Sequence, residues 1–361
     1  MLTEVRIRNF KCIKDVTIPL SPLTAFIGYH DTGKSSILQA IWLLSNFAEP
    51  RDPDWELVQK MLGVDKKIAE KLLFKFEGEL KPKESLGSVI GKRKEVDSAV
   101  ITEQFRERGP FYRYMGMYEK GGALISFLPA RLKKPSYVED YPPILKSDGS
   151  NLPSVLASMQ GDDREGFLKI EQLLTQLVPT IRRILLRRCP VEREEREVIT
   201  VDETKVIRYV KRTYWGDCLW FETATGDKVP AQAISDGTIL LLGYLTALMA
   251  PPQPYLLLID GPEEGIHPRA LEKLVGFFRQ MQQENPELQI LMASHSPDLL
   301  SYLKPEEIVI VRRGEDGYTE AARLDQLPDV EEWLKGMTPG ELWLLSGEDE
   351  LIARIKERLG R

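Results

Sequence analysis

Residues 28–35 have the sequence Gly28-Tyr29-His30-Asp31-Thr32-Gly33-Lys34-Ser35, and this stretch decides the fold. It fits the pattern GxxxxGK[ST], in which backbone N–H groups surround a phosphate, the lysine reaches the β- and γ-oxygens and the serine coordinates Mg²⁺. The apolar run 23–27 leads directly into it, and helical periodicity follows from Ser36 to Phe47. This strand, loop and helix predict a P-loop that binds ATP and Mg²⁺. The expected ATP contacts are Gly28, His30, Asp31, Thr32, Gly33, Lys34, Ser35 and Ser36, with Ser35 also a metal ligand.

Two later strands end in residues that extend this site. Four apolar residues lead into Asp260, and a carboxylate at the tip of a strand beside the P-loop strand can hold Mg²⁺. An ordinary strand-capping aspartate is the alternative. His295 follows another apolar strand, and the order of P-loop, acidic strand and histidine strand favours a γ-phosphate sensor over a simple loop residue. We therefore expect Asp260 to bind the metal and His295 to act in catalysis.

The pattern along the chain predicts an α/β fold with a mostly parallel core sheet, an antiparallel β portion and a helical insertion lobe. Strand-like alternation opens the chain at 2–10, and alternating helices and buried strands return after Pro230. Helices are expected at 151–159 and 167–186, where an apolar stripe runs through the second segment. We expect an N-terminal part of the core at 1–145, an insertion lobe at 146–229 and a C-terminal part of the core at 230–361.

Composition limits the class of protein. The 361 residues carry a formal net charge of −6, which argues against indiscriminate binding of polyanions while leaving room for a local basic patch. The three cysteines, Cys12, Cys189 and Cys218, lie far apart and predict reduced structural thiols. No apolar run is long enough to span a bilayer and no signal peptide opens the chain. A cytoplasmic protein without membrane contact is the expectation.

In this order the motifs resemble the ABC-type ATPase heads of the SMC, RecF and OLD families, above all their short stand-alone relatives. The resemblance covers nearly the whole chain. It rests on the P-loop, the His295 turn and four further segments, which are Val5-Arg-Ile-Arg-Asn-Phe-Lys11, Asp148-Gly-Ser-Asn-Leu-Pro-Ser-Val-Leu156, Ile234-Ser-Asp-Gly-Thr238 and Asp260-Gly-Pro-Glu-Glu-Gly-Ile-His-Pro268. It implies an ABC-type P-loop head and an ATPase. Neither a Toprim-type acidic cluster nor a coiled-coil arm is evident in the sequence.

The resemblance gives residues 235–238 the meaning of an ABC signature, whose Ser235 and Gly237 contact the γ-phosphate held by another protomer. Serine and glycine at a helix N-terminus do make an anion site. The sequence is equally compatible with Ser235 only capping the following helix. If the resemblance holds, two chains form a homodimer across two ATP molecules.

Two departures from the family pattern put hydrolysis in doubt. Relatives follow the magnesium aspartate with a catalytic glutamate, whereas Gly261 stands here, so that Glu263 or Glu264 takes the role or ATP acts mainly as a dimer clamp. His30 replaces the usual asparagine of the P-loop, and assistance to proton transfer and an inert substitution are both open. Gln104 is a weak candidate for the glutamine that usually links magnesium to the accessory lobe.

Two functions follow as hypotheses. In the first, an ATP-closed dimer acts on nucleic acid in DNA repair or anti-phage defence. Its support is three clusters of basic residues, one of them flanked by tyrosines. These are Arg131, Lys133 and Lys134, then Arg182, Arg183, Arg187 and Arg188 on the expected insertion helix, and Tyr112, Arg113 and Tyr114. A solvated helix face paired with the glutamates of 192–197 is the plainer interpretation. In the second, the chain is an ATP-gated scaffold that controls a separately encoded effector, a nuclease or toxin. A transporter ATPase is a third, weaker option.

Overall fold

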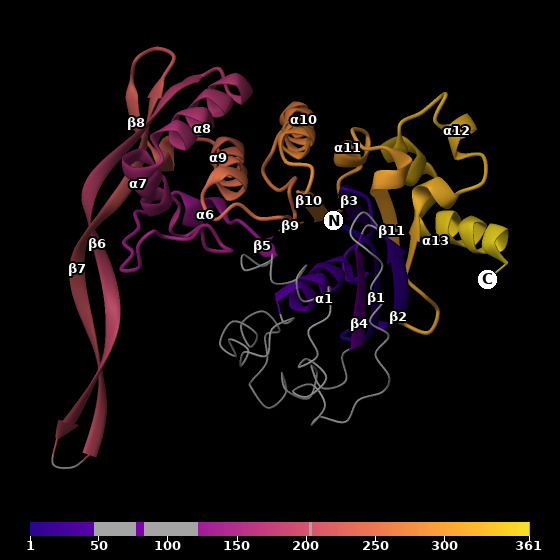
Figure 1. Cartoon of the computed structure of the whole chain (residues 1–361), viewed down its shortest axis with the longest axis horizontal. Helices are drawn as coiled ribbons and strands as arrows, with labels where there is room; N and C mark the ends of the chain where they lie inside the picture. The colour runs from indigo at the N-terminus through magenta and orange to yellow at the C-terminus, as the bar shows by residue number, and fades with distance from the viewer. Residues whose placement is uncertain (47–76, 83–121, 202–203, 361) are drawn as a thin grey trace. The chain divides into compact units, whose positions relative to one another are not determined.

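The structure is a computed structural model and describes residues 1–46, 77–82, 122–201 and 204–360. Within it the chain forms two compact units, residues 1–125 with 254–361 and residues 126–253. Figure 1 shows the elements of each unit. The domain limits expected from sequence stay a prediction.

The first unit is built on a six-stranded sheet in the order β12-β11-β3-β10-β9-β5, parallel throughout except for β12. Every residue of β3 and β10 is buried, because these central strands are covered on both faces. The fold class expected from sequence is confirmed. The strands are β3 (Leu23–Ile27), β5 (Ala123–Ile125), β9 (Leu256–Asp260), β10 (Gln289–Ser294), β11 (Ile308–Arg313) and β12 (Thr319–Arg323).

A second, antiparallel sheet in the same unit joins β1 (Leu2–Phe10) to β2 (Ile13–Pro19) on one side and to β4 (Glu77–Pro82) on the other. The alternating side chains Val5 and Ile7 are fully buried in a core shared with α1 (Lys34–Asn46) and the parallel sheet. The strand expected at 2–10 is therefore confirmed. The remaining helices among the described residues of this unit are α10 (Pro268–Glu284), α11 (Pro297–Leu300), α12 (Val330–Trp333) and α13 (Pro339–Leu359), with 3-10 turns η3 (Pro305–Glu307) and η4 (Leu324–Gln326).

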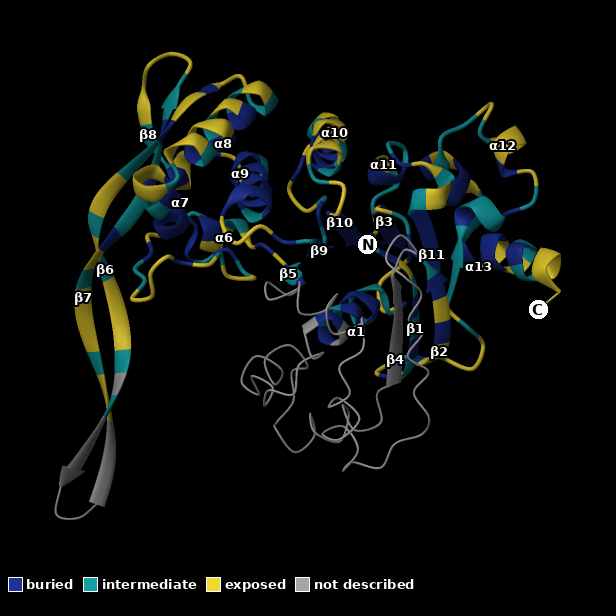
Figure 2. Cartoon of the chain, viewed as in Figure 1, coloured by how far each residue is buried: buried dark blue, intermediate teal, exposed yellow. Residues whose placement is uncertain are grey.

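The second unit contains a long antiparallel hairpin, β6 (Ile181–Val201) and β7 (Thr204–Thr223), with β8 (Lys228–Pro230) added at its base. Figure 2 shows that buried residues gather at this base and on the helices, while exposed residues line much of the remaining hairpin that the structure describes. The helices and 3-10 turn are α6 (Pro129–Leu132), α7 (Leu152–Asp162), α8 (Arg164–Leu177), η2 (Ala231–Ala233) and α9 (Asp236–Met249).

The hairpin corrects the expected helix at 167–186. The helix α8 ends at Leu177, and the chain enters β6 at Ile181. Ile184 is buried as the helical stripe suggested, but it faces inward from a strand whose partner, Phe221, lies 37 positions along the chain in the next strand. Because that pairing is distant in sequence, local periodicity did not reveal it.

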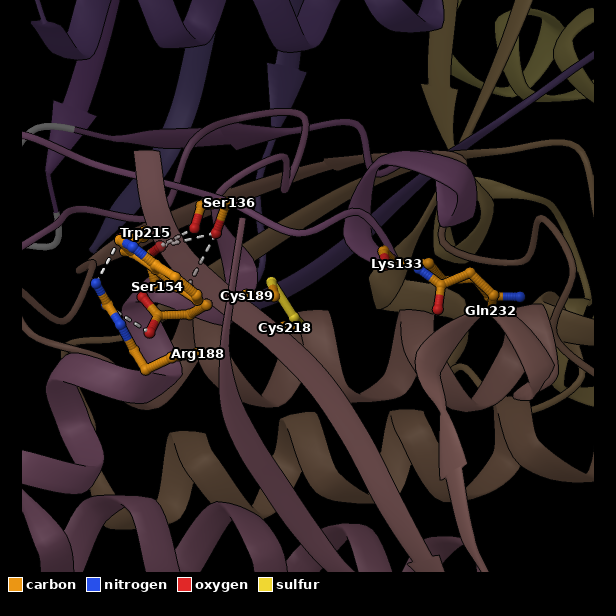
Figure 3. Close-up of a disulfide and its surroundings, with 9 residues drawn as sticks. Lys133, Ser136, Ser154, Arg188, Cys189, Trp215, Cys218 and Gln232 are labelled. Atoms are coloured by element: carbon orange, nitrogen blue, oxygen red, sulfur yellow. Dashed lines mark hydrogen bonds and ion pairs between the residues drawn. A yellow bond between two sulfur atoms is a disulfide. The ribbon is translucent and has the colours of Figure 1, made fainter. Parts of the chain in front are cut away.

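The cysteines correct a second expectation. Cys189 and Cys218 lie on the paired strands β6 and β7 and form a disulfide, shown in Figure 3, with Cα atoms 6.1 Å apart. Only Cys12 is a free thiol among the residues that the structure covers. The 29-residue separation carries no pairing signal, since the hairpin alone brings the two thiols together.

No helix in the described part of the chain is long and apolar enough to cross a membrane.

Candidate active site

The P-loop connects β3 to α1, as its sequence predicts, and its lysine is held by the loop itself. Lys34 Nζ donates to the carbonyl oxygens of Gly28, at 2.7 Å, and Tyr29, at 2.6 Å. The Thr32 hydroxyl also donates to the Tyr29 carbonyl, at 2.9 Å. Burial lowers the pKa of Lys34, and the surrounding carboxylates, first of all Asp260, offset part of that effect. Backbone carbonyl groups of the loop thus hold the Lys34 ammonium group in place.

Two positions of the loop require glycine for different reasons. A Cβ on Gly28 would lie 2.1 Å from the carbonyl oxygen of Val311, so no larger residue fits against β11. Gly33 has φ +106°, a conformation that residues with a Cβ rarely adopt, and a Cβ there would lie 2.3 Å from Thr319 Oγ1. Both glycines of the motif are therefore dictated by the strands that pack against the loop.

Two residues that sequence reasoning missed attach the loop to the edge of the sheet. Arg313 Nε, at the end of β11, donates to the carbonyl of Asp31 at 2.7 Å. The hydroxyl of Thr319, at the start of β12, donates to the carbonyl of Thr32 at 2.9 Å. These contacts span more than 280 residues of sequence, and neither residue belongs to a motif that could have indicated them.

The predicted metal ligands meet across the loop. Ser35 Oγ donates to Asp260 Oδ1 at 3.0 Å. Burial raises the pKa of Asp260, while the Ser35 hydrogen bond and the Lys34 charge oppose that rise. The described residues contain no cluster of three or more His, Cys, Asp or Glu ligands. A hydroxyl and one carboxylate nevertheless fit Mg²⁺, which in nucleotide sites takes its other ligands from phosphates and water.

A carboxylate and a histidine form a pair beside the loop. Glu263 Oε1 accepts the backbone N–H of His295 at 2.9 Å and lies 3.2 Å from His295 Nδ1. Glu263 Oε2 is buried and has no hydrogen-bond partner. The centroids of the His30 and His295 rings lie 5.0 Å apart. The structure thus brings three predicted residues together, whereas Glu264 is exposed to solvent.

The glycine at the usual glutamate position has a structural reason. Gly261 has φ +71°, and its N–H donates to the Ala293 carbonyl at 2.9 Å as the chain turns away from β9. A Cβ at this position would lie 3.1 Å from the Glu264 carboxyl carbon. A glutamate at 261 would therefore be strained in this turn.

The signature segment lies in the second compact unit. Ser235 is the N-cap of α9, and its hydroxyl accepts the Thr238 N–H at 3.3 Å, so the capping role is confirmed. Lys133 fixes the same turn, because its Nζ donates to the Ile234 carbonyl and to Asp236 Oδ1, each at 2.6 Å. Ser235 itself is exposed. Contact of Ser235 and Gly237 with ATP stays a prediction.

The basic residues lie elsewhere than expected. Arg182, Arg183, Arg187 and Arg188 belong to strand β6 and not to a helix, for the reason given above. Two of them pair across the hairpin, Arg182 with Glu222 at 3.5 Å and Arg188 with Asp217 at 3.1 Å, instead of with the glutamates of 192–197.

The first basic group is also engaged, since Arg131 pairs with Asp148 and Lys133 holds the start of α9. Gln104 and the aromatic group at 112–114 lie outside the described residues.

Two family models match the chain, one described as an AAA ATPase domain over residues 1–171 and one as an AAA domain, putative AbiEii toxin, type IV TA system, over residues 160–301. A curated OLD nuclease from Thermus scotoductus is 32% identical over 77 residues, which make up 21% of this chain and 15% of that nuclease. These matches support an SMC/RecF/OLD-like P-loop ATPase. The matched segment spans only a minor part of the length of the nuclease.

Solved structures similar to this ATPase include SMC heads. An SMC head bound to the C-winged helix domain of ScpA is 13% identical and covers 90% of this chain and 97% of its own, with a TM-score of 0.48. The SMC head domain from Thermotoga maritima is 11% identical, with coverages of 89% and 98% and a TM-score of 0.44.

Proposed function

We propose that this ATPase binds and slowly hydrolyses ATP, dimerises on binding it, and acts on or near nucleic acid. The observation that carries the proposal is the contact of Ser35 with Asp260 beside the half-buried Lys34. Lys34 would bind the β- and γ-phosphates, and Ser35 and Asp260 would hold the metal. Mg²⁺, when bound, neutralises charge on the phosphates.

The Glu263 and His295 pair supports a hydrolytic route that needs no glutamate at 261. If Nδ1–H of His295 donates to Glu263, the other ring nitrogen is left as an acceptor for the proton of an attacking water. The Glu263 carboxylate would then stabilise the imidazolium that forms, as carboxylates do beside catalytic histidines. The ring of His30 lies beside the pair, tilted against the ring of His295.

A matched pair of variants tests this route. Glu263→Gln is expected to lower kcat by about 100-fold with little change in ATP affinity, since general base catalysis contributes about 10²–10⁴-fold. Glu264→Gln, which changes the exposed neighbour, should leave turnover close to that of the native chain. Single-turnover ATP cleavage beside nucleotide binding measures both. Equal loss in the two variants, or none in either, would exclude Glu263 as part of the base.

Dimerisation is proposed because the P-loop and the predicted signature are two partial phosphate sites. Ser235 and Gly237 stand at an exposed helix N-terminus, where backbone N–H groups favour anions. Sedimentation of the Glu263→Gln chain with and without ATP and Mg²⁺ measures the state. A chain that binds ATP and stays monomeric at micromolar concentration would contradict this part.

The proposal of a nucleic-acid target rests on the hairpin and on the similarity to an OLD nuclease. Arg183 and Arg187 are exposed on β6, and the Arg187 guanidinium lies 4.1 Å from the centre of the Trp220 ring. Arginines interleaved with aromatic rings suit nucleic acid. We expect ATP-dependent affinity for duplex DNA that falls with salt. Absence of binding at low salt with ATP and Mg²⁺ would refute the target.

An ATP-gated scaffold for a separately encoded effector is the second candidate. Gly261 favours it, since the usual catalytic glutamate is missing, and one matching family model carries a toxin description. On this alternative ATP would act by favouring one of two conformations. Tight ATP-dependent dimerisation with negligible turnover and no affinity for nucleic acid, together with co-purification of a partner protein, would support it over the first.

A further inference from the structure

Three buried side-chain atoms lack a hydrogen-bond partner among the described residues, namely Glu263 Oε2, Trp343 Nε1 and Glu348 Oε1. Buried polar groups nearly always have partners, so each such atom needs an explanation. Glu263 belongs to the site already described. Trp343 and Glu348 lie on α13, in a part of the chain to which no motif assigns a function.

Both α13 residues contact the same residue of the P-loop. The rings of Trp343 and Tyr29 have centroids 5.9 Å apart. Burial raises the pKa of the Glu348 carboxyl, and the backbone N–H of Tyr29 and the charge of Lys34 are among the groups that oppose this rise. The two side chains are almost completely enclosed, with exposed fractions of 7% for Trp343 and 3% for Glu348.

The helix is built so that both residues reach the loop. Gly347 interrupts α13 with φ +68° and ψ 170°, which separates the turn of Trp343 from the turn of Glu348. Leu351, Ile352 and Ile355 are fully buried and anchor the second half. A Cβ on Gly340 would lie 2.1 Å from the Pro297 carbonyl oxygen, so the first half is packed closely on α11.

We propose that α13 is part of the nucleotide site and that Trp343 and Glu348 are positioning residues for Lys34, acting through Tyr29. The Tyr29 N–H interacts with the Glu348 carboxylate, and the Tyr29 carbonyl accepts Lys34 Nζ at 2.6 Å. Fixing this residue at both ends sets where the lysine charge stands. The inference rests on ATP binding by the P-loop, which is part of the proposed function.

Truncating Glu348 tests the assignment. Because the P-loop lysine serves the β- and γ-phosphates, Glu348→Ala should weaken ATP about tenfold while ADP changes less, the size expected for one lost hydrogen bond to a charged group. Glu348→Gln keeps an acceptor for the Tyr29 N–H and should restore most of the affinity. Glu350→Ala, on the same helix and paired with Arg354 at the surface, is the matched control and should bind as the native chain does.

The ATP-induced change in tryptophan fluorescence distinguishes a role of Trp343 at the nucleotide site from a purely structural role. ATP should change the emission of the native chain, and Trp343→Phe should remove most of that change, whereas Trp333→Phe should keep it. Trp333 is 38% exposed on α12 and serves as the control ring.

The outcomes separate this inference from the function on which it rests. A native chain that fails to bind ATP refutes the P-loop proposal itself. A native chain that binds ATP, with Glu348→Ala equal to it or Glu348→Gln as weak as Glu348→Ala, overturns the role of Glu348. Full ATP-induced emission in Trp343→Phe overturns the role of Trp343. If Glu348→Ala does not fold, Glu348→Gln and Trp343→Phe decide.

Discussion

Two helices of this ATPase begin at a segment expected to meet ATP phosphates, and their N-termini are held in different ways. The loop before α1 is fixed from several directions, by Arg313 and Thr319 at the sheet edge and by Lys34 from within. The turn before α9 has an exposed serine and is held mainly by Lys133. In the proposed dimer, the first segment would form the binding half of the site, and the second, from the partner chain, would form the completing half.

The largest expected effect comes from removing the charge of the first half. Lys34→Ala should weaken ATP by about 100-fold, because two or more hydrogen bonds from a charged donor to phosphate are lost. Lys304→Ala removes an exposed lysine paired with Glu306 and is the control. Calorimetric titration measures both. Unchanged ATP affinity in Lys34→Ala would contradict the assignment of the P-loop as the half of the site that binds ATP.

A smaller and more selective effect is expected in the second half. Ser235→Ala should leave ATP affinity of the isolated chain within about twofold and lower ATP-dependent dimerisation about tenfold, the loss expected for one hydrogen bond to a charged phosphate. It should also cost about 1 kcal/mol of stability through loss of the cap. Ser235→Thr keeps a hydroxyl and the cap. Equal dimerisation in Ser235→Ala and Ser235→Thr would reduce this serine to a helix cap.

The smallest effect concerns stability and pH. Burial raises the pKa of Asp260, so its ionised form disfavours the nucleotide-free fold. The contribution of this carboxyl is fully present below its unfolded pKa of about 4 and is lost as pH rises through the higher folded value.

Asp260→Asn should therefore unfold together with the native chain in acid and at a higher temperature near neutral pH, while losing Mg²⁺-dependent ATP binding. Thermal melts across this pH range measure the difference. A variant less stable at neutral pH would show that the Ser35 and Lys34 contacts outweigh burial.

The sequence predicted what depends on neighbouring residues. A buried strand followed by a short motif occurs at the P-loop, at Asp260 and at His295. The central residues of the site could therefore be predicted from the sequence alone. It also left open whether Glu263 or Glu264 takes the role of a base at 261 or ATP acts mainly as a dimer clamp. The structure adds that Glu263 contacts His295, whereas Glu264 is exposed.

What the sequence did not predict depends on pairing across long distances. The residues 181–186 have a pattern compatible with a helix, and only their partners in β7 make them a strand. The same holds for the Cys189 and Cys218 disulfide and for the hydrogen bonds of Arg313 and Thr319 to the P-loop. It also holds for the placement of Trp343 and Glu348 near Tyr29. In each case tertiary packing overrides local preference.

The glycine at position 28 has a consequence for how the protein is made. Its backbone rests against the carbonyl of Val311, and the loop that it opens is fastened by Thr319. During synthesis, which proceeds from the N-terminus, the P-loop leaves the ribosome long before either of those residues exists. A nascent chain thus carries the complete motif for most of its translation without the walls that shape it, and competence to hold nucleotide arrives only with the final strands.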